Sequence, residues 1–425
     1  MSFDKQNFIS NPNFKFQEYP AQLRECLGTT YTYDVYKSKE GKTILITPYW
    51  NIDKQCNTEG DPSVGLENYH FISLIDLSNN KEITTLVGHR DRVVTCRFFE
   101  DPFNGKQYLI SADRKYQVKV WDLTDKGKII FDKHVENYDN FIYSLLMIFD
   151  KTTIYVVVST LGSGETCVYK IGDDQFIKKL NDTKDLNIYY LDYWYEEKDE
   201  NENPEHHIIQ LGKSNILITQ LNKDKNAVIK VNEEKYANIL CGMVFQKGGY
   251  DLLITSSTRG FIQLINLKEK DDNKRVLWSK EYPDVFFYNF VRWNDKYLLL
   301  YEALQRRILI FDTEVENINT PYKIVSKVLC PEMYFDRFIR KVDHPKYGES
   351  ILSVGIDWRV KLYTNRNIVK EEKKEEKEEK EENKEGKNEE PTNETFSARA
   401  APPAAICRAD HHSISFVKIQ TKGLM

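Results

Sequence analysis

The sequence lacks the features that mark several large classes of protein. Its cysteines include no C-x-x-C pair, which argues against a zinc knuckle and a disulfide framework; they are Cys26, Cys56, Cys96, Cys167, Cys241, Cys330 and Cys407. No apolar run approaches the ~18–20 residues of a membrane-spanning helix, and the first residues lack the basic-then-apolar pattern of a secretory signal. We therefore expect a soluble, reduced protein of the cytoplasm without membrane insertion, with the nucleus or a cilium as open alternatives.

The motifs of common catalytic sites are also missing. There is no phosphate-binding glycine loop of either common type and no G-x-S-x-G nucleophile elbow. Among only eight histidines, His206 and His207 follow an acidic stretch, but neighbouring residues of a strand point to opposite sides, so a shared metal site is not expected. The sequence predicts no enzyme activity, no cofactor, no metal and no small-molecule substrate.

The chain has little net charge. The formal value is −5 over 425 residues, and the tract from Lys370 to Glu390, with 11 Glu and 7 Lys, carries four of these five charges. The rest of the chain is close to neutral, so the composition does not require a nucleic-acid or membrane partner. Tyr (26) and Phe (22) are abundant, which favours strands.

A repeated motif organises residues 31–365. Gly88-His89 is followed by Val118-Lys119-Val120 and then by Trp121-Asp122. The same ladder of apolar residue, spacer, apolar residue and bulky residue recurs, and the positions equivalent to Trp121 are spaced by 46, 48, 50, 46, 46 and 52 residues; they are Ile75, Trp121, Tyr169, Thr219, Ile265, Phe311 and Tyr363. Each unit reads as three or four short strands separated by turn residues.

The Gly88-His89 and Trp121-Asp122 pairs resemble the WD repeat of the transducin beta-like family, in which each repeat forms a blade of four antiparallel strands. The resemblance and the spacing predict an all-β chain: a single seven-bladed β-propeller over 31–365 with a disordered charged C-terminal tail. In the family, the N-terminus often supplies the missing outer strand. We expect residues 1–30 to do so, with Phe14–Phe16 as the first candidate and Ser415–Ile419 as the second.

Two segments follow the predicted propeller. Residues 366–394 form a Glu/Lys linker with almost nothing apolar to bury, which predicts a solvated segment; a semi-rigid spacer is the alternative. Residues 395–425 form a tail rich in Ala and Pro whose role, a docking peptide among others, stays open.

The resemblance also assigns residues. Gly88, His89, Trp121 and Asp122 are structural repeat positions, and the family places an Asp that bonds the histidine six residues before the tryptophan. Only Asp357 matches there, and three of the equivalent turn positions are basic instead: Lys115, Lys213 and Arg259. Together with Arg90, Arg92 and Arg359, they predict a basic ring face that binds acidic or phosphorylated protein segments.

The family implies a non-catalytic scaffold that assembles or docks components of a multiprotein complex through the propeller faces. Other proteins are thus the expected partners. One alternative is a nucleic-acid-associated propeller of an RNA-processing or ribosome-biogenesis particle. The other is a propeller enzyme with a site in the central channel, for which the sequence offers no coherent set of catalytic residues.

Overall fold

The computed structural model describes most of the first 365 residues. The described ranges are 8–10, 33–50, 70–135, 142–160, 165–172, 175–180, 188–196, 205–212, 215–221, 226–230, 238–282, 287–302, 305–330, 338–354 and 360–365. The predicted linker and tail, 366–425, lie outside them, as do Phe14–Phe16 and Ser415–Ile419.

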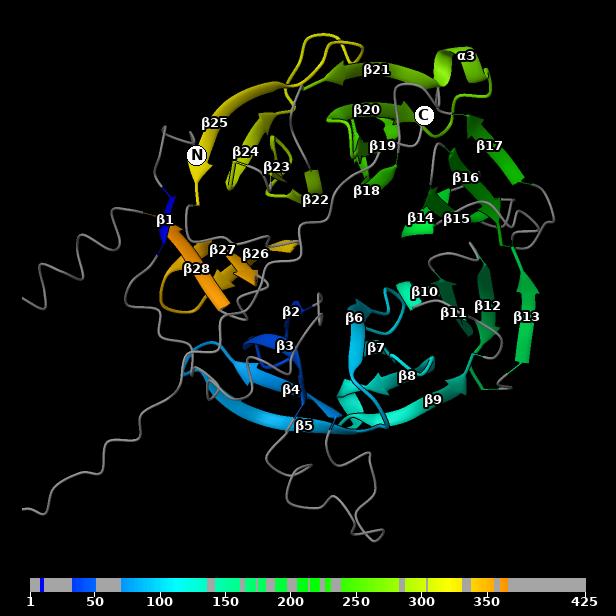
Figure 1. Ribbon diagram of the computed structural model, residues 1–425, viewed down its shortest axis with the longest axis vertical. Helices are drawn as coiled ribbons and strands as arrows, with labels where there is room; N and C mark the ends of the chain where they lie inside the picture. Colours follow the sequence, from blue (N-terminus) through cyan, green and yellow to red (C-terminus); the bar gives the residue numbers. More distant parts are fainter. Residues whose placement is uncertain are drawn as a thin grey trace, which may run out of the picture. The chain divides into compact units, whose positions relative to one another are not determined.

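The described strands form seven four-stranded antiparallel sheets, here called blades 1 to 7 (Figure 1). The first strand of each blade lies nearest the centre and the fourth lies outermost. The bounds are β2 Asp34–Lys37, β3 Thr43–Trp50, β4 His70–Asp76 and β5 Lys81–His89 in blade 1; β6 Val93–Glu100, β7 Gln107–Asp113, β8 Gln117–Asp122 and β9 Lys128–His134 in blade 2; β10 Ile142–Asp150, β11 Thr153–Thr160, β12 Thr166–Lys170 and β13 Gln175–Lys179 in blade 3; β14 Ile188–Glu196, β15 Glu205–Gly212, β16 Asn215–Gln220 and β17 Asn226–Lys230 in blade 4; β18 Ile239–Lys247, β19 Tyr250–Ser257, β20 Phe261–Asn266 and β21 Val276–Glu281 in blade 5; β22 Phe287–Arg292, β23 Tyr297–Glu302, β24 Arg307–Asp312 and β25 Lys323–Leu329 in blade 6; and β26 Phe338–His344, β27 Gly348–Val354, β28 Val360–Asn365 and β1 Phe8–Ser10 in blade 7.

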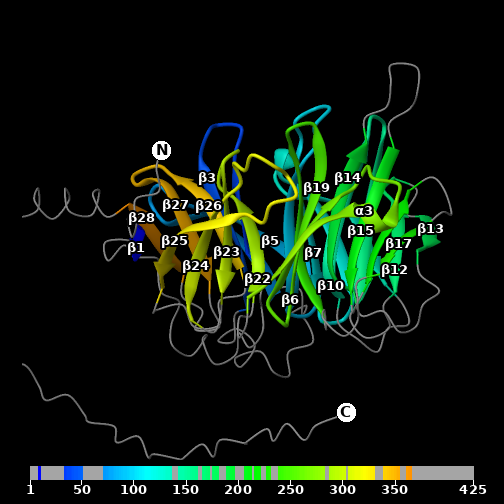
Figure 2. The same cartoon turned by 90° about the horizontal axis from the view of Figure 1, so that it is seen from above.

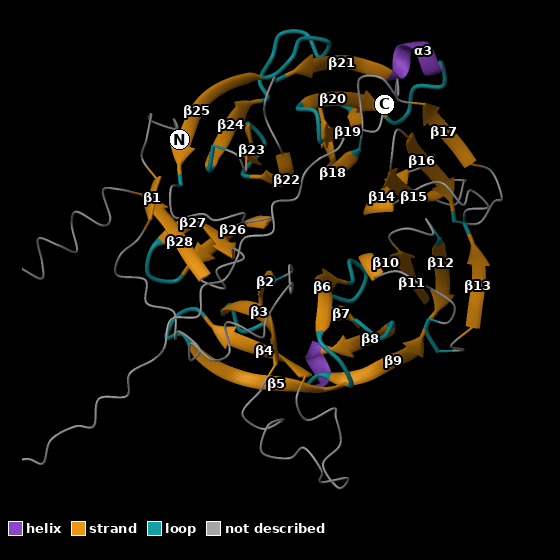
Figure 3. Cartoon of the chain, in the orientation of Figure 1, coloured by secondary structure: helices purple, strands orange, loops and turns teal. Residues whose placement is uncertain are grey.

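Helical structure among the described residues is confined to two short turns, the 3-10 turn η2 (Leu123–Asp125) and α3 (Asp272–Arg275) (Figure 3). No helix in this part of the chain is long and apolar enough to cross a membrane. The predicted all-β, seven-bladed propeller is confirmed.

The third strand of every blade carries one of the seven positions equivalent to Trp121. These strands and their second-strand neighbours are buried along nearly their whole length, as in β7 and β8, because they have a blade on each side. The fourth strands face solvent and alternate instead; β25 is exposed at Lys323 and buried at Ser326 and Val328. The near-constant spacing therefore reflects one burial requirement repeated in each blade.

Apolar clusters fill the junctions between consecutive blades. Seven such clusters occur among the described residues, one for each junction, and the last joins blade 7 to blade 1. It places Tyr33 and Leu45 against Leu352 and Leu362, and the Tyr33 hydroxyl donates to the Leu352 carbonyl oxygen at 2.8 Å. The ring is thus closed by the same packing that joins the other blades.

The N-terminal segment supplies the outer strand of blade 7. Strand β1 pairs with β28 in antiparallel register, with Ile9 opposite Thr364. Phe8–Ser10 therefore occupies the place for which the sequence suggested Phe14–Phe16. This pairing adds a second link between the two ends of the propeller, alongside the apolar cluster.

Because strands in a blade alternate in direction, their connections divide between two faces of the ring, seen edge-on in Figure 2. The junction face carries the turns between second and third strands and the connections from a fourth strand to the next blade. The hairpin face carries the turns between first and second strands and between third and fourth strands.

Candidate functional site

Four side chains of blade 2 and its junction with blade 1 form a buried hydrogen-bonded chain below the junction face. The Nδ1 atom of His89 lies 3.2 Å from Asp113 Oδ2, and its Nε2 lies 2.7 Å from Ser111 Oγ. The Trp121 Nε1–H donates to the same Ser111 oxygen at 2.8 Å. His89, Ser111, Asp113 and Trp121 are almost completely shielded from solvent.

The order of donors follows from the charge state of His89. Burial lowers the pKa of His89 more than the Asp113 carboxylate raises it, so the ring is neutral near neutral pH. A neutral ring that donates from Nδ1 to Asp113 accepts at Nε2 from the Ser111 hydroxyl, which leaves the Ser111 oxygen to accept from Trp121. Every polar group of these four side chains has a hydrogen-bond partner, so the network is rigid.

The acidic partner of His89 is Asp113, not the residue six positions before Trp121. That position is Lys115, so the family's offset of six residues does not locate the aspartate of blade 2. Asp113 ends β7, and its Oδ1 also accepts the backbone N–H groups of Lys115 (2.9 Å) and Gln117 (3.0 Å). The turn therefore places the carboxylate two residues earlier than expected. Asp357, the only residue that fitted the family position, lies outside the described residues.

Gly88 and Asp122 have structural roles. Gly88 has φ +148, and a Cβ atom there would lie 3.3 Å from Ile129 Cδ1 and 3.4 Å from Trp121 Cη2. Asp122 caps η2, because its side chain accepts from the N–H groups of Thr124 and Asp125. Both residues shape blade 2 around the buried network.

Basic side chains crowd the loops directly above this network. Arg90 and Arg92 lie in the connection from β5 to β6, and Arg114 and Lys115 lie in the turn from β7 to β8. The two loops are joined by a hydrogen bond from the Arg114 N–H to the Arg92 carbonyl oxygen, 2.9 Å long. We call these four residues the basic patch. Arg90 and Lys115 are exposed.

One carboxylate accompanies the basic patch within its two loops. Asp91 accepts the backbone N–H of Arg92 at 2.6 Å and is half-buried. Within these two loops, four cationic residues therefore accompany one carboxylate. Their loops are held in place by Asp113 and His89, so the patch is presented on a rigid base.

The other predicted basic residues are not part of this patch. Arg259 lies in the turn between β19 and β20 of blade 5 and is exposed, whereas Lys213 and Arg359 lie outside the described residues. Among the described residues, the structure joins Arg90, Arg92 and Lys115, with Arg114 beside Lys115 in the same turn.

Sequence reasoning missed four charged side chains on the inner strands. Arg340 Nε of blade 7 lies 3.2 Å from Asp34 Oδ1 of blade 1, and the Asp34 Oδ2 accepts the Phe98 N–H of blade 2 at 2.9 Å. Arg97 donates to the Leu191 carbonyl oxygen at 3.1 Å, and its Nη2 lies 3.8 Å from Asp192 Oδ1. For Arg97 in β6 and Asp192 in β14, a charged residue within a largely apolar and aromatic strand was the available signal.

Polar and charged side chains of the inner strands link neighbouring blades through hydrogen bonds. Asp192 of blade 4 accepts the Val244 N–H of blade 5 at 3.0 Å, and Asn289 of blade 6 exchanges hydrogen bonds with the backbone of Ile339 in blade 7. Burial raises the pKa of Asp192, and Arg97 opposes that rise. The carboxylates are thus already engaged by arginines and backbone N–H groups, an arrangement that serves cohesion of the ring.

The two adjacent histidines point to opposite sides of β15, as the sequence predicted. His206 Nδ1 lies 2.6 Å from the Tyr193 hydroxyl, whereas His207 stacks on Trp194 with ring centroids 4.3 Å apart. Glu196, Glu205 and His207 could offer three metal-ligand atoms within 4.8 Å of one another. His207 Nε2 lies 3.2 Å from Glu196 Oε2 and 3.6 Å from Glu205 Oε2, so the imidazole itself links the two carboxylates.

Solved structures similar to this chain share the same ring of blades. The β-propeller domain of Myceliophteria thermophila Cps50 (Swd1) superposes with a TM-score of 0.53 at 13% identity, over 78% of this chain and 95% of that chain. BBS1N, solved in complex with ARL6DN, gives a TM-score of 0.54 at 8% identity, over 85% of this chain and 98% of that chain. No family model and no curated protein sequence matches the chain. The fold is a seven-bladed β-propeller.

Proposed function

We propose that this chain is a non-catalytic scaffold of the WD-repeat type that docks acidic or phosphorylated protein segments on the basic patch. The observation that carries the proposal is the convergence of Arg90, Arg92, Arg114 and Lys115 on two hydrogen-bonded loops. The cytoplasm is the proposed compartment.

The chemistry of the patch favours a partner with carboxylates or phosphates. Three of the four cations are arginines, whose planar guanidinium groups bind such anions through two parallel hydrogen bonds. The chain outside the Glu/Lys tract is nearly neutral, so this concentration of charge is local. A local positive field speeds association with acidic partners and disfavours basic ones.

The rigidity of the base also supports docking. A binding loop that is already ordered loses less conformational entropy when the partner arrives. The buried chain from Trp121 through Ser111 and His89 to Asp113 supplies that order. BBS1N offers a parallel, since a propeller of similar shape was solved with a protein partner, ARL6DN.

Affinity purification tests the proposal. The wild-type chain, an R90E/K115E variant and an R259E control would be tagged and the co-purifying proteins quantified by mass spectrometry. We expect a set of proteins with acidic or phosphorylated segments that is depleted by R90E/K115E and retained by R259E, which changes the charge on blade 5. Equal recovery of these proteins with all three chains would exclude the basic patch as their docking site. Recovery of RNA in place of protein would favour the nucleic-acid alternative.

A further inference from the structure

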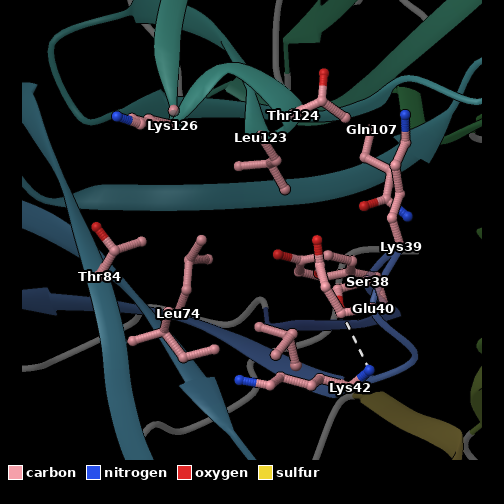
Figure 4. A pocket seen from close by; sticks show the side chains of 14 residues that line it. Ser38, Lys39, Glu40, Lys42, Leu74, Thr84, Gln107, Leu123, Thr124 and Lys126 are labelled. Carbon is pink, nitrogen blue, oxygen red and sulfur yellow. Dashed lines mark hydrogen bonds between the residues drawn. The ribbon is translucent and has the colours of Figure 1, made fainter.

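A groove opens where blades 1 and 2 meet on the hairpin face, the face opposite the basic patch. Figure 4 shows the side chains that line this groove, and its volume is about 530 Å³. Blade 1 lines it with side chains that include Leu74 and Thr84, and blade 2 lines it with Gln107, Leu123 and Thr124. The volume falls within the range of about 300–1,000 Å³ that is common for ligand sites.

The floor of the groove is apolar. Ile44 and Leu74 belong to the cluster that joins blades 1 and 2, and Tyr36 and Leu123 pack against that cluster. Ile83 also lines the groove and is 51% exposed. The blade junction therefore leaves apolar surface uncovered at this point, and burying such surface under a partner stabilises binding.

Both rims of the groove are ordered turns. On blade 1, the Ser38 N–H donates to the Lys42 carbonyl oxygen at 2.8 Å, and the Lys42 N–H donates to Ser38 Oγ at 3.2 Å. On blade 2, the Gly127 N–H donates to the Asp122 carbonyl oxygen at 2.8 Å. Gly127 has φ +75, and a Cβ atom there would lie 2.3 Å from Leu86 Cδ2, so glycine is needed for this turn to approach blade 1.

The two rim turns contain three lysines, Lys39, Lys42 and Lys126, and two carboxylates, Glu40 and Asp125, so they carry a positive excess. Lys39 and Lys126 are exposed and belong to opposite rims, and Figure 4 shows them on different sides of the opening. Lys42, also on the rim, lies 3.7 Å from Asp76. Glu40 is the carboxylate of the lining; its pKa is lowered by its hydrogen bond with Ser38 and by Lys42 and Lys39, so it stays ionised. Lys39 and Lys126 would thus attract an anion on each side of the apolar floor.

We propose that this groove docks a short acidic peptide of a partner protein. One large apolar side chain of the peptide lies on the floor beside Leu74 and Ile83, and carboxylates before and after it meet Lys39 and Lys126. The apolar contact supplies affinity, and the two flanking charges set which peptides bind. This second docking site goes beyond the proposed function, because it lies on the other face of the ring and uses none of the basic patch.

Fluorescence anisotropy with labelled peptides tests the groove on the full chain. The probe is a short peptide with one central Leu flanked by Glu on both sides; its matched controls carry Ser in place of Leu, or Lys in place of Glu. The protein variants are K39E/K126E, which reverses the rim charges, and T84W, which fills the groove at an exposed position. R90E/K115E serves as the matched charge reversal on the opposite face.

We expect the Leu-Glu probe to bind the wild-type chain, and K39E/K126E and T84W each to weaken it by about tenfold. Because the basic patch is itself proposed to bind acidic segments, the peptides are also compared on the R90E/K115E chain, to which the Leu-Glu probe should still bind and both control peptides should bind weakly. Circular dichroism confirms that each variant is folded. The proposed docking site would be overturned if the probe did not bind at millimolar concentration, or if the Ser and Leu peptides bound equally. Loss of binding only in R90E/K115E would also overturn it, while leaving the proposed function intact.

Discussion

Arg340 of the last blade and Asp34 of the first blade meet across the closure of the ring, with Arg340 Nε 3.2 Å from Asp34 Oδ1. The other carboxylate oxygen of Asp34 accepts the Phe98 N–H of blade 2 at 2.9 Å. A single side chain therefore connects blades 7, 1 and 2. This link complements the outer pairing of β1 with β28, so the ring is held at both its inner and its outer edge.

Substitution of one partner of this pair should destabilise the propeller. R340M leaves the partly shielded Asp34 carboxylate without its arginine, and we expect the free energy of unfolding to fall by about 2–3 kcal/mol. D34N should lower the free energy of unfolding by a similar amount. The D34N/R340M double variant should lose less stability than the two single variants lose together. Urea unfolding of the four chains measures the coupling. Strictly additive losses would mean that the two residues do not stabilise each other.

The buried network of blade 2 predicts a large effect at Asp113. D113A removes the acceptor of His89 and of two backbone N–H groups, so we expect a loss of about 3 kcal/mol in the free energy of unfolding. D125A, which truncates an exposed carboxylate on the same blade, should lose less than about 0.5 kcal/mol. Thermal and urea unfolding measure the stability of both variants. A D113A chain as stable as the D125A chain would show that the buried network does not stabilise the propeller.

Buried histidines should make the propeller less stable in acid. Burial lowers the pKa of both His70 and His344 from 6.5 to about 4 in the folded chain. Below about pH 6.5 the unfolded chain takes up protons that the folded chain does not, so stability is complete above that pH and declines toward pH 4. Each histidine should remove about 2 kcal/mol by pH 5. The raised pKa of Asp192 acts in the opposite direction.

Urea unfolding at pH 7.5 and pH 5 measures this dependence. H344N retains an acceptor near the backbone N–H groups of Lys346 and Tyr347, which His344 Nδ1 now accepts at 3.1 and 3.3 Å, but cannot titrate. Its stability should therefore fall less between the two pH values than that of the wild type. An equal fall in both chains would show that His344 does not contribute.

The sequence predicted the architecture because one physical requirement is repeated. Every third strand is buried between two blades, so an apolar ladder ending in a bulky residue returns at the blade period, as at Trp121 and Tyr363. The ring-closing strand was harder to place. Phe14-Lys-Phe16 alternates as an amphipathic strand should, but the choice of Phe8–Ser10 depends on pairing with β28, more than 350 residues away in the chain.

The site was less predictable than the fold. A fixed offset from Trp121 pointed to Lys115, whereas the turn itself selects Asp113, whose carboxylate accepts from residues two and four positions later. Arg114 and Arg92 become neighbours through the pairing of β6 with β7 in blade 2, where Val93 lies opposite Asp113. The groove beside Leu74 arises between two turns of different blades. Local patterns identify strands, while sites between blades depend on contacts that no local pattern contains.

Binding of an acidic phosphopeptide as a function of salt tests the docking role of the basic patch most directly. The affinity of the wild-type chain for a labelled peptide rich in phosphoserine and Asp would be measured by anisotropy at low and high salt, beside R90E/K115E and R259E. The account predicts binding that weakens as salt rises, a loss of about tenfold or more in R90E/K115E at low salt, and little change in R259E. Equal affinity of R90E/K115E and wild type at low salt would contradict it.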